Sequence, residues 1–190
     1  MIMGIKAHDY DIATDAKPED VMRIFRKVIP TGIAHGTVTV HIFGMELETT
    51  TFRTESDYSD GRHPDKIEFA ATIEEDLSRR DFTMNAIAYD ILNKKIVDPF
   101  EGQKDIKNKT IRTVGNALER FTEDGLRPVR ALRFASQLGF LIEEETFKSI
   151  SIPAVLEKTR NISPERFRDE FCKILSTNKP SVGLKLLEQT

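Results

Sequence analysis

The chain has 190 residues, which is enough for one or two domains that each bury a core. Its net charge is −3, and that balance neither supports nor excludes a nucleic-acid partner, because local patches matter more than the total. The single cysteine, Cys172, excludes a disulfide framework and a thiolate zinc site within the chain. No apolar run reaches the length of a membrane span and no signal-peptide pattern is present, so we expect a cytoplasmic protein without a membrane partner.

The first part of the chain mixes strand and helix patterns. Alternating apolar and polar residues predict strands, apolar residues at helical spacing predict a helix, and a polar stretch with Gly61 and Pro64 predicts a loop. In chain order we expect a strand over 9–13, a helix over 17–29, a β-hairpin over 35–43 and 46–53, and a loop over 54–66.

The second part becomes helical. A helix is predicted over 73–92, a short β segment over 94–100, and a turn of helix with a last strand over 101–115. After Gly115 the strand signals stop, and helical patterns cover 116–121, 123–138, 143–150 and 163–175. The sequence therefore predicts an α+β protein with a domain boundary near residue 115.

Three acidic residues are candidate metal ligands. Asp9 and Asp11 are separated by one residue in a predicted strand, so their side chains face the same side. Glu48 lies in the second strand of the hairpin, and the three carboxylates converge if that strand neighbours residues 9–13. Such hard oxygen ligands suit Mg²⁺ in phosphoryl or nucleotidyl transfer. A lone Asp-x-Asp pair is more often solvated, so both interpretations stay open at this point.

The segment RRDFTMNA, residues 79–86, is a second candidate site. Arg80 has a fork of donors that suits a phosphate or a carboxylate, and Asp81 and Asn85 share one face if the segment is helical. The alternative is a helix start capped by Asp81 and Thr83, with the arginines in surface salt bridges. The residue types favour neither interpretation.

The segment EDGLRPVRALRF is a third candidate. Asp124 precedes a stripe of Arg127, Arg130 and Arg133, which recur every three residues. An Asp–Arg pair offers the acceptors and donors that reading a base edge requires, and the stripe suits a triphosphate or an RNA backbone. The usual meaning of such a pattern is an amphipathic helix with a solvated face and ion pairs along it. Pro128 requires that this helix begin only a few residues before it.

Taken together, these segments resemble the class II transfer-RNA nucleotidyltransferases. That group comprises the CCA-adding enzymes and the related bacterial poly(A) polymerases, within the DNA polymerase beta-like nucleotidyltransferase superfamily. The resemblance runs over nearly the whole chain, and the RRDFT and EDxLR motifs at this separation are highly specific. It is carried, in order, by HDYDIAT, HGTVTV, ELETTTFRTE, DGRHP, EEDLSRRDFTMNAIAYD, VDPFEGQKDI, IRTVG and RFTEDGLRPVRALRFASQLGF.

The resemblance implies a fold and an activity. It implies a nucleotidyltransferase head with a small mixed β-sheet flanked by helices over residues 1–115, followed by an all-helical neck over 116–190. It also implies template-independent addition of CMP and AMP to the 3′ acceptor end of transfer RNA. The substrates would be CTP and ATP, the cofactor Mg²⁺, and the RNA partner transfer RNA.

The resemblance also implies roles for the candidate residues. Asp9 and Asp11 would hold the metal, and Glu48 would be the third catalytic carboxylate. In the RRDFT segment, Arg80 would contact the nucleotide, and Asp81 and Asn85 would shape the ribose pocket. In the EDGLR segment and its helix, Asp124 and Arg127 would contact the base edge, and Arg130 and Arg133 would support that helix and the triphosphate. A flexible loop linked to nucleotide choice would contain Asp60, Arg62 and His63.

The sequence departs from the family pattern at both ends. Family members have a Gly-Gly-x-x-Arg-Asp segment before the Asp-x-Asp pair, and only eight residues precede Asp9 here. The family continues into body and tail domains, and this chain stops in the neck, so we expect a fragment or a misplaced start. The alternatives are a bacterial poly(A) polymerase, a non-catalytic nucleotide- or RNA-binding module, and a small-molecule nucleotidyltransferase, which the EDGLR segment disfavours. The residues alone do not separate CCA addition from CC, A or poly(A) addition.

Overall fold

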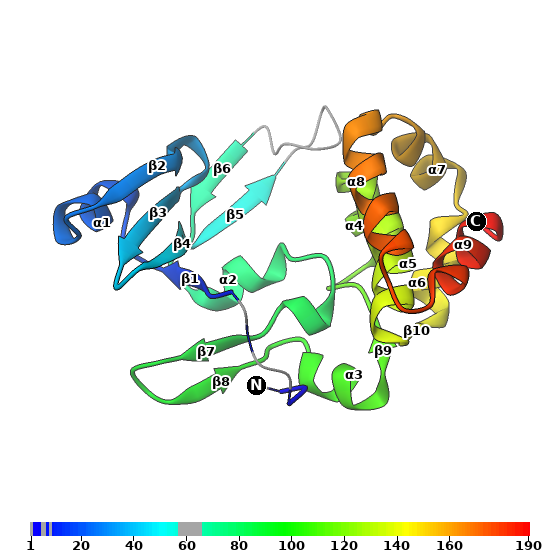
Figure 1. Ribbon diagram of the computed structural model, residues 1–190, viewed down its shortest axis with the longest axis horizontal. Coiled ribbons are helices and arrows are strands. Elements are labelled where there is room, and N and C mark those ends of the chain that lie inside the picture. The colour runs from blue at the N-terminus through cyan, green and yellow to red at the C-terminus, as the bar shows by residue number, and fades with distance from the viewer. Residues whose placement is uncertain (1, 5–6, 8, 57–65) are drawn as a thin grey trace. The chain divides into compact units, whose positions relative to one another are not determined.

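The computed structural model describes most of the chain, over residues 2–4, 7, 9–56 and 66–190 (Figure 1). Packing divides these residues into two units, of which the first ends at Arg79 and the second spans Arg80–Thr190. The change to helical structure predicted near residue 115 thus falls inside the second unit. The predicted loop residues Asp60, Arg62 and His63 lie outside the described residues.

The first unit is built around one mixed sheet of four strands in the order β1-β4-β3-β2 (Figure 1). Strand β1 runs parallel to β4, and the remaining pairs are antiparallel. The elements of this unit are β1 (Asp11–Thr14), α1 (Pro18–Ile24), β2 (Val28–Gly32), the 3₁₀ turn η1 (Ile33–His35), β3 (Thr37–Ile42), β4 (Met45–Thr51), β5 (Arg53–Ser56), β6 (Lys66–Phe69) and α2 (Ile73–Ser78).

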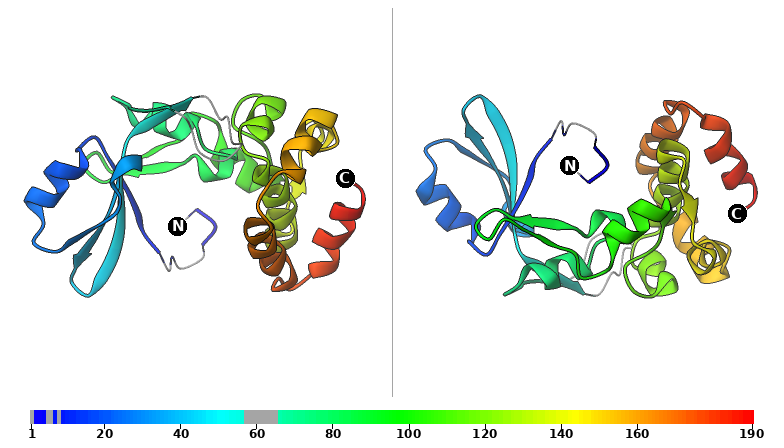
Figure 2. Two further views of the ribbon diagram at one scale, coloured as in Figure 1. Left: turned by 90° about the horizontal axis from the view of Figure 1, so that it is seen from above. Right: turned by 90° about the horizontal axis from the view of Figure 1, so that it is seen from below.

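The two faces of this sheet differ in polarity, as the alternation in β3 predicts. Val38 and Val40 are buried and pack with Val21 of α1, which lies against one side of the sheet (Figure 2). Thr37 and Thr39 point to the opposite, polar face. The predicted hairpin of β3 and β4 is confirmed, and it fixes which side chains of β4 face the core.

The helix predicted over 17–29 is shorter than expected. Helix α1 ends at Ile24, and residues Val28–Gly32 form β2, where Val28 pairs with Val40. Apolar residues at both helical and alternating positions fit either structure, and pairing with β3 decided in favour of a strand.

The second unit contains two small two-stranded sheets and a set of helices. Its elements are the 3₁₀ turn η2 (Thr83–Asn85), β7 (Ala88–Asp90), β8 (Lys95–Val97), α3 (Gly102–Asn108), β9 (Thr110–Ile111), α4 (Ala117–Glu123), α5 (Leu126–Leu138), β10 (Leu141–Ile142), α6 (Glu144–Ile150), α7 (Pro153–Arg160), α8 (Pro164–Leu175) and α9 (Pro180–Glu188). Helix α5 packs against both α8 and α9 (Figure 2).

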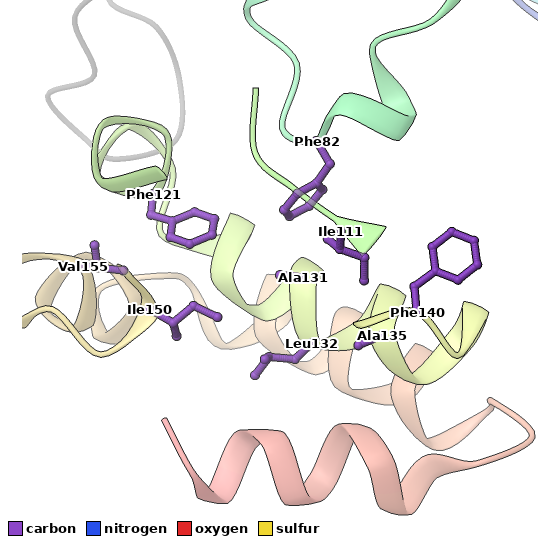
Figure 3. Close-up of a cluster of buried hydrophobic side chains, with 9 residues drawn as sticks. All are labelled: Phe82, Ile111, Phe121, Ala131, Leu132, Ala135, Phe140, Ile150 and Val155. Carbon is purple, nitrogen blue, oxygen red and sulfur yellow. The ribbon is translucent and has the colours of Figure 1, made fainter. Parts of the chain in front are cut away.

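A buried apolar cluster holds the second unit together (Figure 3). Phe82 precedes η2 and Ile111 lies in β9, whereas Phe121, Leu132 and Val155 come from α4, α5 and α7. Because side chains of this size each contribute about 1.5–3 kcal/mol on burial, the cluster fixes the RRDFT segment against the helices.

Two predictions for this part of the chain were wrong in detail. The helix predicted over 73–92 stops at Ser78 and gives way to η2 and to strand β7, which pairs with β8. Strand signals were expected to stop after Gly115, yet the two residues of β10 pair with β9. Both differences arise from pairing with segments that a local pattern does not include. No described helix is long and apolar enough to span a membrane.

Candidate functional site

The acidic residues of the first unit lie at one edge of its sheet. In the parallel pair of β1 and β4, Asp11 is the register partner of Glu48, and Glu48 is in turn opposite Thr39 of β3. Register partners project to the same face, which here is the polar one. Asp11 and Glu48 are both exposed, so two carboxylates stand side by side on neighbouring strands. The sequence left open whether these two strands are neighbours, and their pairing meets that condition for Asp11 and Glu48.

Asp9 precedes β1 rather than lying in it. It is exposed, and its Oδ1 accepts a hydrogen bond of 3.0 Å from the backbone N–H of Tyr10. Among the described residues, no group of three acidic, histidine or cysteine side chains is gathered closely enough to hold a metal ion. The donor chemistry nonetheless suits Mg²⁺, which is usually bound by one or two carboxylates together with waters and phosphate oxygens. Asp9, Asp11 and Glu48 supply only such hard oxygen atoms.

The first arginine of the RRDFT motif has a structural role in the first unit. The Nη2 of Arg79 lies 2.8 Å from Oδ1 of Asp76 on α2, and its Nη1 lies 3.1 Å from Oε1 of Glu55 on β5. Asp76 is only 1% exposed, and the same oxygen accepts from the backbone N–H of Arg53. This network joins α2 to β5, so Arg79 is not in a surface salt bridge.

Asp81 is tied to its own turn and to a distant helix. Its Oδ1 accepts from the backbone N–H of Phe82 and from Nδ2 of Asn85, at 2.9 and 3.0 Å. Its Oδ2 lies 2.6 Å from Nη2 of Arg130 on α5. Asp81 and Asn85 are thus brought together by a 3₁₀ turn rather than by an α-helix. Arg80, the residue before Asp81, is half-buried.

The RRDFT turn is held by a carboxylate from outside the motif, that of Asp105. Asp105 is buried on α3, and its Oδ2 accepts from the Thr83 hydroxyl at 2.7 Å and from Nε of Arg112 at 3.2 Å. A Cβ on Gly102 would lie 2.2 Å from the carbonyl oxygen of Thr83, so glycine permits this close approach. The GQKDI part of the chain therefore positions the turn that contains Asp81.

Asp124 lies between α4 and α5 in extended backbone. Its Oδ1 accepts from the backbone N–H of Leu126 at 2.9 Å, and its Oδ2 lies 2.8 Å from Nη2 of Arg166 on α8. Helix α5 begins at Leu126, which places Pro128 in its first turn, where proline is tolerated.

The neighbouring acid, Glu123, is paired with two other arginines. Its Oε2 lies 2.7 Å from Nη1 of Arg127, and its Oε1 lies 2.8 Å from Nη2 of Arg120. Arg127 also donates to the backbone carbonyl of Arg120 at 3.2 Å. Arg127 and Asp124 therefore sit at the same turn, each positioned by a different partner.

The remaining arginines of α5 do not form a solvated face. Arg133 pairs with Glu170 of α8, with side chains 9% and 4% exposed, and its guanidinium lies 3.8 Å from the ring centre of Phe134. Burial lowers the pKa of Arg130, but the Asp81 carboxylate outweighs this effect and leaves that pKa raised. Burial raises the pKa of Glu170, yet hydrogen bonds from Lys173 and Arg133 outweigh it and leave the pKa lowered.

Sequence reasoning missed Arg166, Glu170 and Asp105 as site-supporting residues. For Arg166 and Glu170, the sequence pattern predicts only a helix over 163–175 within the neck. Arg166 and Glu170 are four residues apart and are followed by the buried Ile174, so they fall on one face of α8. Charged residues on the same face as a buried isoleucine are a signal of buried ion pairs, and this spacing could have identified them.

Comparison with known proteins identifies the family. Residues 1–112 match the model of the poly(A) polymerase head domain, and residues 139–190 match the model described as "Probable RNA and SrmB- binding site of polymerase A". The chain belongs to the class II transfer-RNA nucleotidyltransferase and bacterial poly(A) polymerase family, as the sequence resemblance predicted.

Several relatives are CCA-adding enzymes. The chain is 50% identical over 185 residues to that of Ligilactobacillus salivarius, which covers 97% of this chain and 45% of the relative. It is 52% identical over 169 residues to that of Enterococcus faecalis, covering 88% of this chain and 41% of the relative. The chain thus spans a little under half the length of these relatives.

Solved structures agree with this assignment. A crystal structure of the Bacillus stearothermophilus CCA-adding enzyme in complex with CTP matches with a TM-score of 0.88 and 46% identity, over 100% of this chain and 45% of that one. The Thermotoga maritima CCA-adding enzyme complexed with tRNA matches with a TM-score of 0.79 and 27% identity, over 99% and 43% of the two chains.

Proposed function

We propose that this chain is the head and neck of a template-independent RNA nucleotidyltransferase that adds CMP and AMP to transfer-RNA 3′ ends from CTP and ATP. Residues 1–115 would form the catalytic head and 116–190 the nucleotide-selecting neck. The observation that carries the proposal is the register of β1 and β4, which sets the carboxylates of Asp11 and Glu48 side by side on an exposed face. An enzyme acting on transfer RNA would work in the cytoplasm.

The carboxylates would act by holding positive charge near the reacting phosphate. Asp9 and Asp11 would bind Mg²⁺, with Glu48 as the third carboxylate. When bound, such ions would neutralise charge on the phosphate oxygens while the RNA 3′-hydroxyl bonds to the α-phosphorus, the bond between the α- and β-phosphates breaks and pyrophosphate leaves. The chain's own residues would fix the geometry, which is the main task of a protein in phosphoryl transfer.

The second unit would supply nucleotide binding and choice. An ionised carboxylate only accepts hydrogen bonds and a guanidinium only donates them. Cytosine and adenine both present an exocyclic amine donor, where guanine and thymine or uracil present a carbonyl acceptor. Asp124 would accept from that amine and Arg127 would donate to the neighbouring ring nitrogen, so the pair favours CTP and ATP. Arg80, Asp81, Asn85, Arg130 and Arg133 would bind or support the ribose and triphosphate.

The test is incorporation of labelled CTP or ATP into transfer RNA that lacks its CCA end, in the presence of Mg²⁺. We expect Glu48→Gln and Asp11→Asn to reduce incorporation by at least about 100-fold, the loss typical when a catalytic electrostatic group is removed. Glu46→Gln is the matched control, because Glu46 lies two residues away on the same face of β4 and is also exposed. It should leave incorporation unchanged.

Other outcomes would point elsewhere. Long tails made from ATP alone would identify a poly(A) polymerase. Nucleotide binding without any incorporation by the wild-type chain would identify a non-catalytic module and refute the proposed activity. Equal losses in Glu46→Gln and Glu48→Gln would remove Glu48 from the mechanism.

A further inference from the structure

We propose that Arg166 of α8 is a positioning residue for nucleotide selection, which acts by fixing the carboxylate of Asp124. The inference rests on the proposed function, since it assigns the control of base choice to a residue outside the EDGLR segment. It begins from the contact between Nη2 of Arg166 and Oδ2 of Asp124, at 2.8 Å.

The backbone at Asp124 does not by itself fix the direction of its side chain. Asp124 is the residue that ends α4, and its backbone is extended rather than helical. Its Oδ1 is held by the backbone N–H of Leu126. The terminal torsion of an aspartate is broad, so one hydrogen bond on one oxygen leaves the carboxylate plane free to rotate about that contact. The bond from Arg166 to the second oxygen removes this freedom.

The two contacts leave acceptor capacity for a ligand. A carboxylate has roughly four lone-pair sites, of which Leu126 and Arg166 occupy two. The remaining sites point in directions that the two partners set. Asp124 and Arg166 are 17% and 20% exposed, so solvent or a ligand still reaches the pair. A fixed carboxylate of this kind selects for a donor placed at a fixed position, which is what an exocyclic amine offers.

Arg166 is itself held in place by the packing of its helix. One turn further along α8, Glu170 pairs with Arg133 of α5 in a buried contact. On the other side of Asp124, a Cβ on Gly125 would lie 2.4 Å from the carbonyl oxygen of Lys158, so the end of α7 abuts the turn. Helices α5, α7 and α8 thus all constrain the position of Asp124. Among the described residues, Arg166 is the side chain that reaches the Asp124 carboxylate from another helix.

The experiment measures equilibrium dissociation constants of CTP, ATP, UTP and GTP for the full chain with Mg²⁺. We expect the wild type to prefer CTP and ATP. Arg166→Ala should weaken CTP and ATP binding about tenfold, which corresponds to about 1.4 kcal/mol, and should leave UTP and GTP nearly unchanged. Arg166→Lys keeps a donor and a charge and should recover part of the preference. Arg168→Ala is the matched control on the same helix, because Arg168 is 67% exposed and pairs with the adjacent Asp169.

Two further measurements separate positioning from a general structural effect. If Arg166 acts through Asp124, then Arg166→Ala should change the preference no further in an Asp124→Asn background. A uniform loss of affinity for all four nucleotides, an unchanged preference, or an additive effect in the double variant would overturn the inference. Should Arg166→Ala fail to fold, judged by circular dichroism, Arg166→Lys with and without Asp124→Asn gives the same comparison.

The binding measurement also separates this inference from the proposed function. In one outcome, the wild type binds CTP and ATP selectively, Arg166→Ala loses this selectivity, and yet the wild type extends no RNA. That result would refute the enzymatic activity and support the role of Arg166. Equal binding of all four nucleotides by the wild type would overturn the role of Arg166, whether or not RNA is extended.

Discussion

Replacing Glu170 by alanine leaves the guanidinium of Arg133 buried without its carboxylate. The two side chains are 9% and 4% exposed, and removing one partner of a buried ion pair typically costs about 3–5 kcal/mol. Arg133 keeps a hydrogen bond to Gln137 and its contact with the Phe134 ring, and these partners offset part of the loss. We therefore expect Glu170→Ala to lower the free energy of unfolding by about 3 kcal/mol. For a chain of this size that is a fall in Tm of about 6–12 °C.

The assay is urea unfolding at neutral pH, followed by far-ultraviolet circular dichroism. Lys173→Ala serves as the control, because Lys173 pairs with the same carboxylate at 2.8 Å but is 58% exposed. An exposed partner of this kind contributes less than about 1 kcal/mol. The double variant Arg133→Met, Glu170→Leu removes both charges of the pair. It should lower the free energy of unfolding by much less than the sum of the losses in Arg133→Met and Glu170→Leu made singly.

The reasoning would be refuted if Glu170→Ala and Lys173→Ala lowered the free energy of unfolding equally. It would also be refuted if the double variant lost as much free energy of unfolding as Arg133→Met and Glu170→Leu lose when their separate losses are added. Either result would mean that the carboxylate of Glu170 is not desolvated with Arg133, and that α8 is held to α5 by apolar contacts alone.

Three other changes test separate parts of the structure. Asp105→Ala leaves the hydroxyl of Thr83 without its buried acceptor and should lower the free energy of unfolding by about 2 kcal/mol in the same urea assay; a loss near zero would exclude this contact from the support of the turn. Gly125→Ala places a Cβ 2.4 Å from the backbone oxygen of Lys158 and should cost about 1–3 kcal/mol, whereas a neutral result would show that α7 can move away. Because the pKa of Glu170 is lowered in the folded state, its carboxylate stabilises the fold above about pH 4.5, and this contribution is lost as the pH falls through the folded-state pKa. Glu170→Gln should remove that part of the acid sensitivity, measured as the free energy of unfolding against pH. An unchanged pH profile would contradict the prediction.

Much of the local structure could be predicted from the sequence, where one pattern had one solution. The alternation of Val38 and Val40 with threonines admits only a half-buried strand, and the structure contains it. The helix beginning near Gly125 was likewise predictable, because Pro128 limits where it can start. By contrast, Val28 had apolar neighbours at both spacings, and only its pairing with Val40 made it part of a strand.

In the candidate site, too, some features could be predicted from the sequence and others depended on the tertiary structure. The types and order of the chemical groups, such as Asp11, Glu48 and Asp124, were evident from the sequence, because motif residues are defined by their neighbours in the chain. That Asp11 and Glu48 are adjacent was conditional on strand order, and only the parallel pairing of β1 with β4 established it.

What the sequence by itself determined is the inventory of acids and arginines, the α+β class and the family resemblance. The tertiary structure decided which arginine holds which acid. Asp124 is met by Arg166, 42 residues further along the chain, and Asp81 by Arg130, 49 residues further along. Such pairs depend on how helices pack, since a hydrogen bond needs its two atoms within about 3 Å and separation along the chain imposes no such distance. The residues that position Asp124 and Asp81 therefore became evident only in the folded chain.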